Sequence, residues 1–130
     1  MAEHRADFTL TFRRLCNAAA DPEGDRAVGA LFANPAAFEG WAAGWRKRLQ
    51  QETLSGQALA EAMRRENPAY IPRNHLVEAV IRAAVDREDF RPFEELLAVG
   101  SHPYEERPGL EAYTRPAAPE ELVTATFCGT

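Results

Sequence analysis

The sequence predicts an all-α protein of about five or six amphipathic helices, followed by a Pro-rich extended C-terminal tail. Ala is abundant and all but one of the 15 basic residues are Arg, and both residue types favour helices. Alternating runs of Val, Ile and Thr are nearly absent, whereas apolar residues recur at the three- and four-residue spacing of a helix face. We therefore expect a helical region, 1–100, and a tail, 101–130.

Caps and prolines mark the first helices. Asp7 can cap a helix that ends near Ala20, because its carboxylate can accept the free N–H groups of the first turn. Asp21-Pro22 disfavours continuation of that helix, and a second, short helix is expected at 25–33. On the expected face of the first helix, Cys16 should behave as a small buried hydrophobe.

Capping residues and a proline also mark the starts of the next two helices. Asn34-Pro35 predicts the start of a helix that runs to about Glu52, and Ser55 can cap another that ends near Glu66. The first of them carries the broadest apolar stripe of the chain, which consists of Phe38, Trp41, Ala42, Trp45 and Leu49. The two tryptophans could form a stacking platform for bases, but their shared face favours a packed core.

Two more helices are expected before residue 100. Asn74 is a plausible N-cap, preceded by Arg73, which we interpret as an ion-paired residue. Its helix should bury Leu76, Val77, Val80, Ile81 and Ala84. The helix at 89–99 should turn Phe90, Phe93, Leu96 and Leu97 inward.

The amino-acid composition changes after Gly100, because four of the chain's nine prolines follow within a short stretch. Residues 102–121 are predicted to be extended along the surface. Leu122, Val123, Thr124 and Phe127 could form a short docked strand.

Composition limits the classes of function. A net charge of −5 and a pI near 5.2 argue against non-specific binding to nucleic acid or anionic lipid, which requires a basic face. No apolar run reaches the roughly 18 residues of a membrane span, and 1–7 lacks the apolar core of a signal peptide. Cys16 and Cys128 form neither a disulfide scaffold nor a paired zinc motif. We expect a cytoplasmic protein without nucleic-acid or membrane partners.

The residues alone show no catalytic, cofactor-binding or metal site. There is no P-loop, no Gly-x-Gly-x-x-Gly, no nucleophile elbow and no His-x-x-Glu-His motif. Glu94/Glu95 and Glu105/Glu106 are expected on the solvated surface. The histidines, His4, His75 and His102, are isolated. Cys128 is the third residue from the C-terminus, where a thiol can be accessible and reactive or simply an inert surface group.

Several segments, in order along the whole chain, resemble the C-terminal part of the SelO (selenoprotein O) family. The most specific are the block Asn67-Pro68-Ala69-Tyr70-Ile71-Pro72-Arg73-Asn74-His75 and the ending Thr126-Phe127-Cys128-Gly129-Thr130. The others are Asp7-Phe8-Thr9-Leu10-Thr11-Phe12-Arg13-Arg14-Leu15, Phe38-x-x-Trp41 with Arg46 and Leu49 behind it, Glu78, Phe93-x-x-Leu96-Leu97, and Pro103-Tyr104.

The resemblance implies an activity that this chain lacks the residues to perform. SelO proteins have a kinase-like fold and transfer AMP from ATP to Ser, Thr or Tyr hydroxyls of other proteins, with a divalent metal, usually magnesium. The family's nucleotide-binding lysine, its glutamate partner and its metal-binding Asp and Asn residues lie upstream of this region. Lys47, the only lysine, matches none of them. The chain would therefore be an inactive, structural fragment of the C-terminal lobe, whose partners are a missing N-terminal kinase-like region and, in the full-length enzyme, protein substrates.

The resemblance also implies a role for Cys128. This position holds selenocysteine in animal homologues and cysteine in many bacterial ones, and in the family it is thought to form a redox-sensitive disulfide with the kinase-like part. Cys128 is thus our redox candidate.

The alternative to a fragment of a SelO-like enzyme is a free-standing helical protein-interaction module. Amphipathic helices cut from a larger core expose apolar faces that bind partners.

Overall fold

The all-α prediction is confirmed by a computed structural model, which describes residues 6–123. Six α-helices and three short 3-10 helices occupy these residues, and no β-strand occurs among them. The chain divides into two compact units, which meet in sequence between Ala69 and Tyr70.

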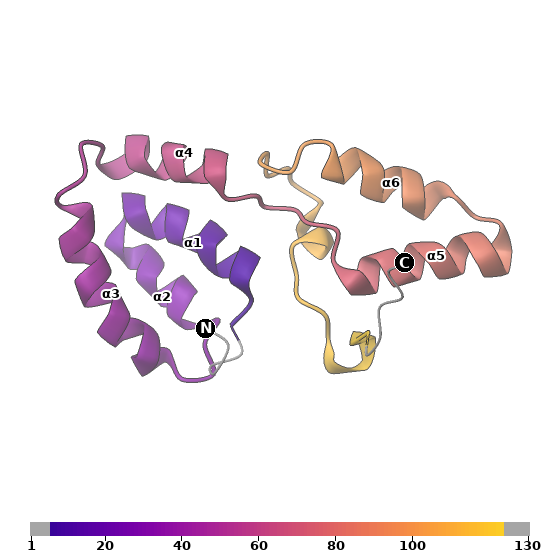
Figure 1. Cartoon of the computed structure of the whole chain (residues 1–130), viewed down its shortest axis with the longest axis horizontal. Coiled ribbons are helices and arrows are strands. Elements are labelled where there is room, and N and C mark those ends of the chain that lie inside the picture. The colour runs from indigo at the N-terminus through magenta and orange to yellow at the C-terminus, as the bar shows by residue number, and fades with distance from the viewer. Residues whose placement is uncertain (1–5, 124–130) are drawn as a thin grey trace, which may run out of the picture. The chain divides into compact units, whose positions relative to one another are not determined.

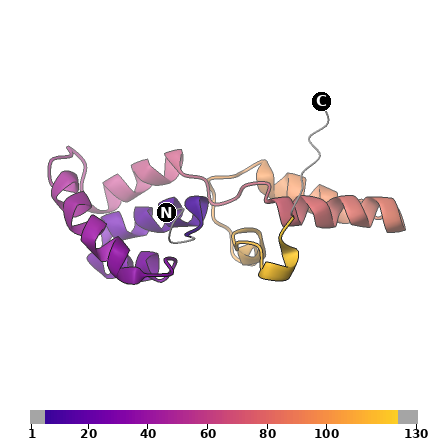
Figure 2. The same cartoon turned by 60° about the horizontal axis from the view of Figure 1, so that its bottom comes forward.

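The first unit contains four α-helices, drawn in indigo to magenta in Figure 1. They are α1 (Phe8–Ala20), α2 (Asp25–Gly29), α3 (Pro35–Leu49) and α4 (Gly56–Glu66), with the 3-10 helix η2 (Pro22–Gly24) between α1 and α2. α1 packs against α4 and α2, and α2 packs in turn against α3. Figures 1 and 2 both show α1 inside this group of helices.

The core of the first unit consists of residues from α1, α2 and α3. Its buried members are Leu15, Ala18, Val28, Phe38 and Ala42, and Phe12, Phe32, Trp45 and Met63 pack against them. Cys16 is fully buried, as predicted, and its Sγ donates to the carbonyl of Phe12 at 3.2 Å. The apolar residues that recur at helical spacing in α1 therefore lie on a buried face of that helix.

Two of the predicted caps are confirmed in full. The carboxylate of Asp7 accepts from the amide of Leu10 at 2.8 Å, and the side chain of Asn34 accepts from that of Ala36 at 3.2 Å. Ser55 occupies the N-cap position of α4, but its side chain makes no capping hydrogen bond. α2 ends at Gly29, four residues before the predicted end.

Gly24 allows η2 to lie close to α1. A Cβ at this position would stand 2.8 Å from Cα of Ala18, a backbone atom that cannot move aside. Only glycine therefore fits here without displacing one of the two elements.

The second unit contains α5 (Asn74–Arg87) and α6 (Arg91–Gly100), which pack against each other. The helix predicted to follow an Asn74 cap begins one residue early, with Arg73 as N-cap, because the carbonyl of Arg73 already accepts from the amides of Leu76 and Val77. Glu88 ends α5 in the left-handed conformation, with φ of 52°.

The Pro-rich segment is not uniformly extended. It contains two 3-10 helices, η3 (Glu111–Tyr113) and η4 (Pro119–Glu121), drawn in yellow in Figure 1. Leu122 and Val123, two residues of the predicted docked strand, are not in a strand. The other two, Thr124 and Phe127, lie outside the described residues.

Candidate functional site

A buried arginine organises the end of α4. Arg13 is only 5% exposed, and its Nη1 donates to the carbonyls of Arg64 at 3.1 Å and Asn67 at 2.9 Å. The side chain of Asn67 adds a bond to the carbonyl of Met63 at 2.7 Å. The last carbonyls of a helix have no partner within the helix, so α1 supplies part of the C-terminal cap of α4. The sequence pattern places Arg13 off the apolar face and gives no sign of this role.

The Tyr70–Arg73 stretch holds the Pro-rich segment within the second unit. The buried Tyr70 donates its amide to the carbonyl of Pro103 at 3.2 Å, and its hydroxyl accepts from the amide of Arg107 at 2.9 Å. The buried Arg73 donates from Nη2 to the carbonyl of Thr114 at 2.8 Å. These contacts give a structural role to the block that carries much of the family resemblance.

His75 lies just inside α5 and is buried, with 9% of its surface exposed. Its Nε2 has no hydrogen-bond partner in the part of the chain that the structure describes. Burial lowers the pKa of His75 below the ordinary value of 6.5; nearby Glu121 opposes this shift, and Arg115 and Arg73 reinforce it. Burial therefore disfavours the protonated form of the imidazole.

The two tryptophans of α3 differ in their surroundings. Their rings stack with centroids 5.5 Å apart and an interplanar angle of 16°, and the guanidinium of Arg46 lies 4.9 Å from the ring centroid of Trp45. Trp45 packs against the core, as predicted, but Trp41 is 51% exposed, so its predicted place in the core is wrong. The five-residue α2 covers only part of α3, including Phe38 and Ala42.

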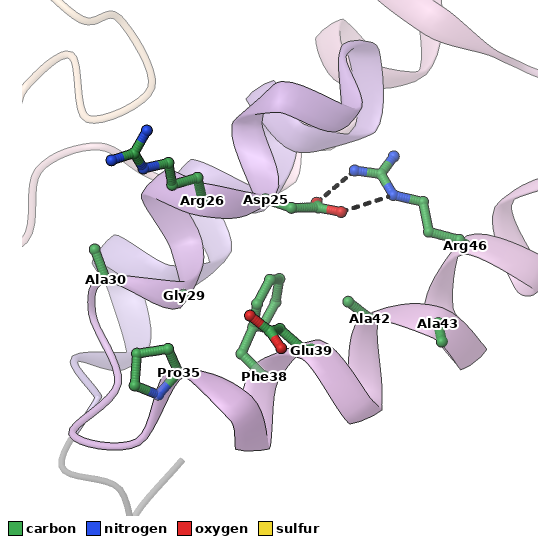
Figure 3. A pocket seen from close by; sticks show the side chains of 10 residues that line it. All are labelled: Asp25, Arg26, Gly29, Ala30, Pro35, Phe38, Glu39, Ala42, Ala43 and Arg46. Carbon is green, nitrogen blue, oxygen red and sulfur yellow. Dashed lines mark hydrogen bonds and ion pairs between the residues drawn. The ribbon is translucent and has the colours of Figure 1, made fainter.

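A groove of about 540 Å³ runs between α2 and α3 (Figure 3). Phe38 lies between the two helices, and the side chain of Arg46 reaches across to form a bidentate ion pair with Asp25. The residues that line the groove are Asp25, Arg26, Gly29, Ala30, Pro35, Phe38, Glu39, Ala42, Ala43 and Arg46. With Asp25 bound to Arg46, the arrangement suits an apolar side chain better than acid–base chemistry.

The second unit leaves two apolar stripes uncovered. Ile81 and Val85 form the α5 stripe, and Phe90, Phe93 and Leu97 form the α6 stripe; each of the five is at least 50% exposed. Their spacing of three or four residues places Ile81 and Val85 on one side of α5, and Phe93 and Leu97 on one side of α6, with Phe90 at the N-cap of α6. The expectation that Ile81, Phe90, Phe93 and Leu97 face inward is wrong for the described residues. Among the apolar residues of α5 and α6, only Ala83 and Val99 are fully buried in the described part of the chain.

A second hollow lies beside the α6 stripe. This α6 groove has a volume of about 320 Å³ and is lined almost entirely by apolar and aromatic groups. Its walls are Tyr70, Ile71, Pro72, Phe93, Leu96, Leu97, Val99, Gly100, Ser101 and Tyr113. A concave apolar surface beside an exposed apolar stripe is typical of a place where another polypeptide packs.

The predicted site residues are not brought together. Within residues 6–123, no three His, Cys, Asp or Glu side chains are grouped so that they could hold a metal ion. Glu94, Glu95, Glu105, Glu106 and His102 are exposed. The redox candidate, Cys128, and His4 lie outside the described residues. No helix in the described part of the chain has the length and apolar character needed to cross a membrane.

Comparison with known proteins identifies the family to which this chain belongs. The family model described as protein adenylyltransferase SelO matches residues 1–100. Curated relatives named protein nucleotidyltransferase YdiU match the entire chain: 58% identity over 130 residues in Rhodopseudomonas palustris (strain BisB5), 54% over 130 in Nitrobacter hamburgensis, and 48% over 136 in Methylorubrum extorquens. The chain belongs to the SelO family, and it spans about a quarter of the length of these relatives, 26–27%.

Proposed function

We propose that the chain is the C-terminal, structural part of a SelO-type nucleotidyltransferase, which in its complete form transfers AMP from ATP to hydroxyl groups of proteins. The observation that carries this proposal is the pair of uncovered apolar stripes on α5 and α6. Burying a large apolar side chain is worth roughly 1.5–3 kcal/mol, so these stripes are suited to packing against a further part of the enzyme. The relatives, about four times as long as this chain, have the additional polypeptide to supply it.

The described residues do not fit ATP and magnesium, the cofactors that the family resemblance implies. A triphosphate site needs backbone amides and cations that converge on phosphate, with carboxylates for the metal. Lys47 is exposed near the end of α3, and the described carboxylates form no metal-holding group. We therefore propose that the nucleotide and the metal bind outside this chain, and that the chain by itself is inactive.

Labelled ATP tests this proposal directly. The chain incubated with ATP and magnesium is expected to show neither stoichiometric binding nor self-labelling, measured by equilibrium dialysis and by mass spectrometry. The R. palustris BisB5 relative, at full length, serves as the positive control. Saturable binding of one nucleotide per chain would overturn the assignment of ATP to the missing part.

We also propose that Cys128 is a redox-active thiol of the complete enzyme, in a protein of the reducing cytoplasm. Exchange with a disulfide requires an accessible thiolate, and the resemblance to the family aligns Cys128 with the position that is thought to take part in such exchange. Cys16 is an internal reference, because it is fully buried in α1.

The two thiols should differ in their rate of alkylation. Cys128 is expected to react with iodoacetamide more than about tenfold faster than Cys16, because a buried group reacts only after local opening of the structure. Peptide mass spectrometry over a time course gives both rates from one sample. Equal rates, or slower labelling of Cys128, would remove the redox proposal.

The apolar stripes also favour a second function, a free-standing helical interaction module. Light scattering distinguishes the two. Dimers or larger aggregates of the isolated chain suit a part separated from its neighbour, whereas a stable monomer favours an independent module.

A further inference from the structure

The charges of this chain are divided unequally between its two units. Residues 1–69 contain nine acidic and nine basic residues, whereas residues 70–130 contain 11 acidic and six basic ones. The whole net charge of −5 therefore belongs to the second unit. A unit of this charge attracts a basic partner and repels an acidic one.

Part of this negative charge lies beside the α6 stripe. Arg91, the basic residue of α6, is held by Asp89 in a bidentate ion pair at 2.8 and 2.9 Å. Glu94 is exposed and lies four residues after Phe90 and three before Leu97, so it borders the stripe. No basic side chain of residues 6–123 forms an ion pair with Glu94. Its carboxylate is therefore available to a cation of another polypeptide.

The α6 groove has apolar walls, and its few polar groups already have partners. The residues with a polar side-chain group that line it are Tyr70, Ser101 and Tyr113. The hydroxyl of Ser101 donates to the carbonyl of Leu97 at 2.8 Å, and that of Tyr70 accepts from a backbone amide at 2.9 Å. The hydroxyl of Tyr113 donates to the carboxylate of Glu95 at 3.3 Å, which brings a second negative charge to a wall of the groove. Such a groove suits an apolar side chain better than a polar ligand.

We propose that the α6 stripe and the α6 groove receive a segment of the rest of the enzyme in which large apolar side chains are flanked by Lys or Arg. This inference rests on the proposed function, which supplies the missing polypeptide, and adds the chemistry of the segment that covers α6. Its apolar side chains fill the groove and cover Phe93 and Leu97, and its cations pair with Glu94 and Glu95. An acidic segment, or a second copy of this unit, would bring like charges together.

Two designed peptides of opposite charge test the chemistry of the partner on the whole 130-residue chain. Each is a helix of about 15 residues, roughly four turns, with the same stripe of Leu and Phe, flanked by Lys in one peptide and by Glu in the other. We expect the Lys peptide to bind about tenfold more tightly at low salt, measured by calorimetry. The difference should shrink below about threefold at high salt, because salt screens the charges. NMR should show shifts of the amides of Leu96, Leu97 and Val99.

A charge reversal on α6 shows where the preference arises. Glu94→Lys should weaken binding of the Lys peptide about fivefold. Glu66→Lys, the matched control, makes the same change at an exposed carboxylate at the end of α4 and should alter the Kd less than about twofold. A scrambled Lys peptide, with the same composition but no apolar stripe, should bind more weakly, because charge alone does not fill the groove.

The outcomes separate this inference from the proposed function. Equal affinities for the two peptides, binding of neither, or amide shifts that spare α6 would overturn the inference. These results come from the unchanged chain, so they decide the matter even where Glu94→Lys fails to fold. Association of this chain with the unmatched part of the R. palustris BisB5 relative would then still support the proposed function. A preference for the Lys peptide without any such association would contradict the proposed function, and with it the segment that we assign to α6.

Discussion

Leu97→Asp is expected to weaken association of this chain with the rest of a SelO-type enzyme about 100-fold. Leu97 is 58% exposed on the α6 stripe and lines the α6 groove, so our proposal buries it at the interface. A carboxylate buried there without a partner costs several kcal/mol, and each factor of ten in affinity corresponds to about 1.4 kcal/mol.

The measurement is a titration of this chain into the part of the R. palustris BisB5 relative that the chain does not match, about three quarters of that protein. Leu54→Asp is the matched control: it makes the same change at another exposed leucine, 44% exposed, between α3 and α4. Equal Kd values for the two variants would contradict the assignment of the interface to α6.

Phe38→Ala should lower the free energy of unfolding of the first unit by about 3–5 kcal/mol. Phe38 is 2% exposed at the centre of the core, and its ring lies 5.6 Å from that of Phe32. The loss combines the removed apolar surface with the cavity that remains.

Urea unfolding followed by tryptophan fluorescence reports on this unit, because both tryptophans of the chain lie on α3. The control is Phe8→Ala at a ring that is 68% exposed, where we expect a loss below about 1 kcal/mol. A loss for Phe38→Ala as small as that of the control would mean that α2 and α3 do not pack as described.

Helix positions in the first unit could be predicted from the sequence because their signals are local. Asp7 and Asn34 cap their helices through amides two or three residues away, and Asp21 and Pro22 stop α1 within the same few residues. The burial of Cys16 follows from its place on an apolar face. Each of these features depends on neighbours along the chain, which the sequence displays directly.

Contacts between distant residues could not be predicted in this way. Arg13 is buried because the carbonyls of Arg64 and Asn67, more than 50 positions away, accept its hydrogen bonds. Periodicity shows which residues share one side of a helix, but it does not show what covers that side. For this reason it places Trp41 and Leu97 correctly on their stripes and wrongly in a core.

The Pro-rich segment is predictable only in outline. Four prolines exclude a long helix, but the 3-10 helices η3 and η4 depend on the local bonds of Glu111 and Glu121. His75 is isolated in the sequence, and the Pro-rich segment returns to the beginning of α5 because Arg73 binds the carbonyl of Thr114. The resemblance to the SelO family includes the block Asn67–His75, but it does not indicate what the residues of this block contact.

Hydroxyl-radical footprinting tests most directly whether the stripes of α5 and α6 are packing surfaces. The chain is oxidised alone and together with the unmatched part of the R. palustris BisB5 relative, and the rate is followed at Phe90, Phe93 and Leu97, with exposed Phe8 as the reference. We predict that the three α6 residues lose most of their reactivity in the mixture while Phe8 changes little. Unchanged oxidation of the α6 stripe in a mixture that forms a complex would contradict the account.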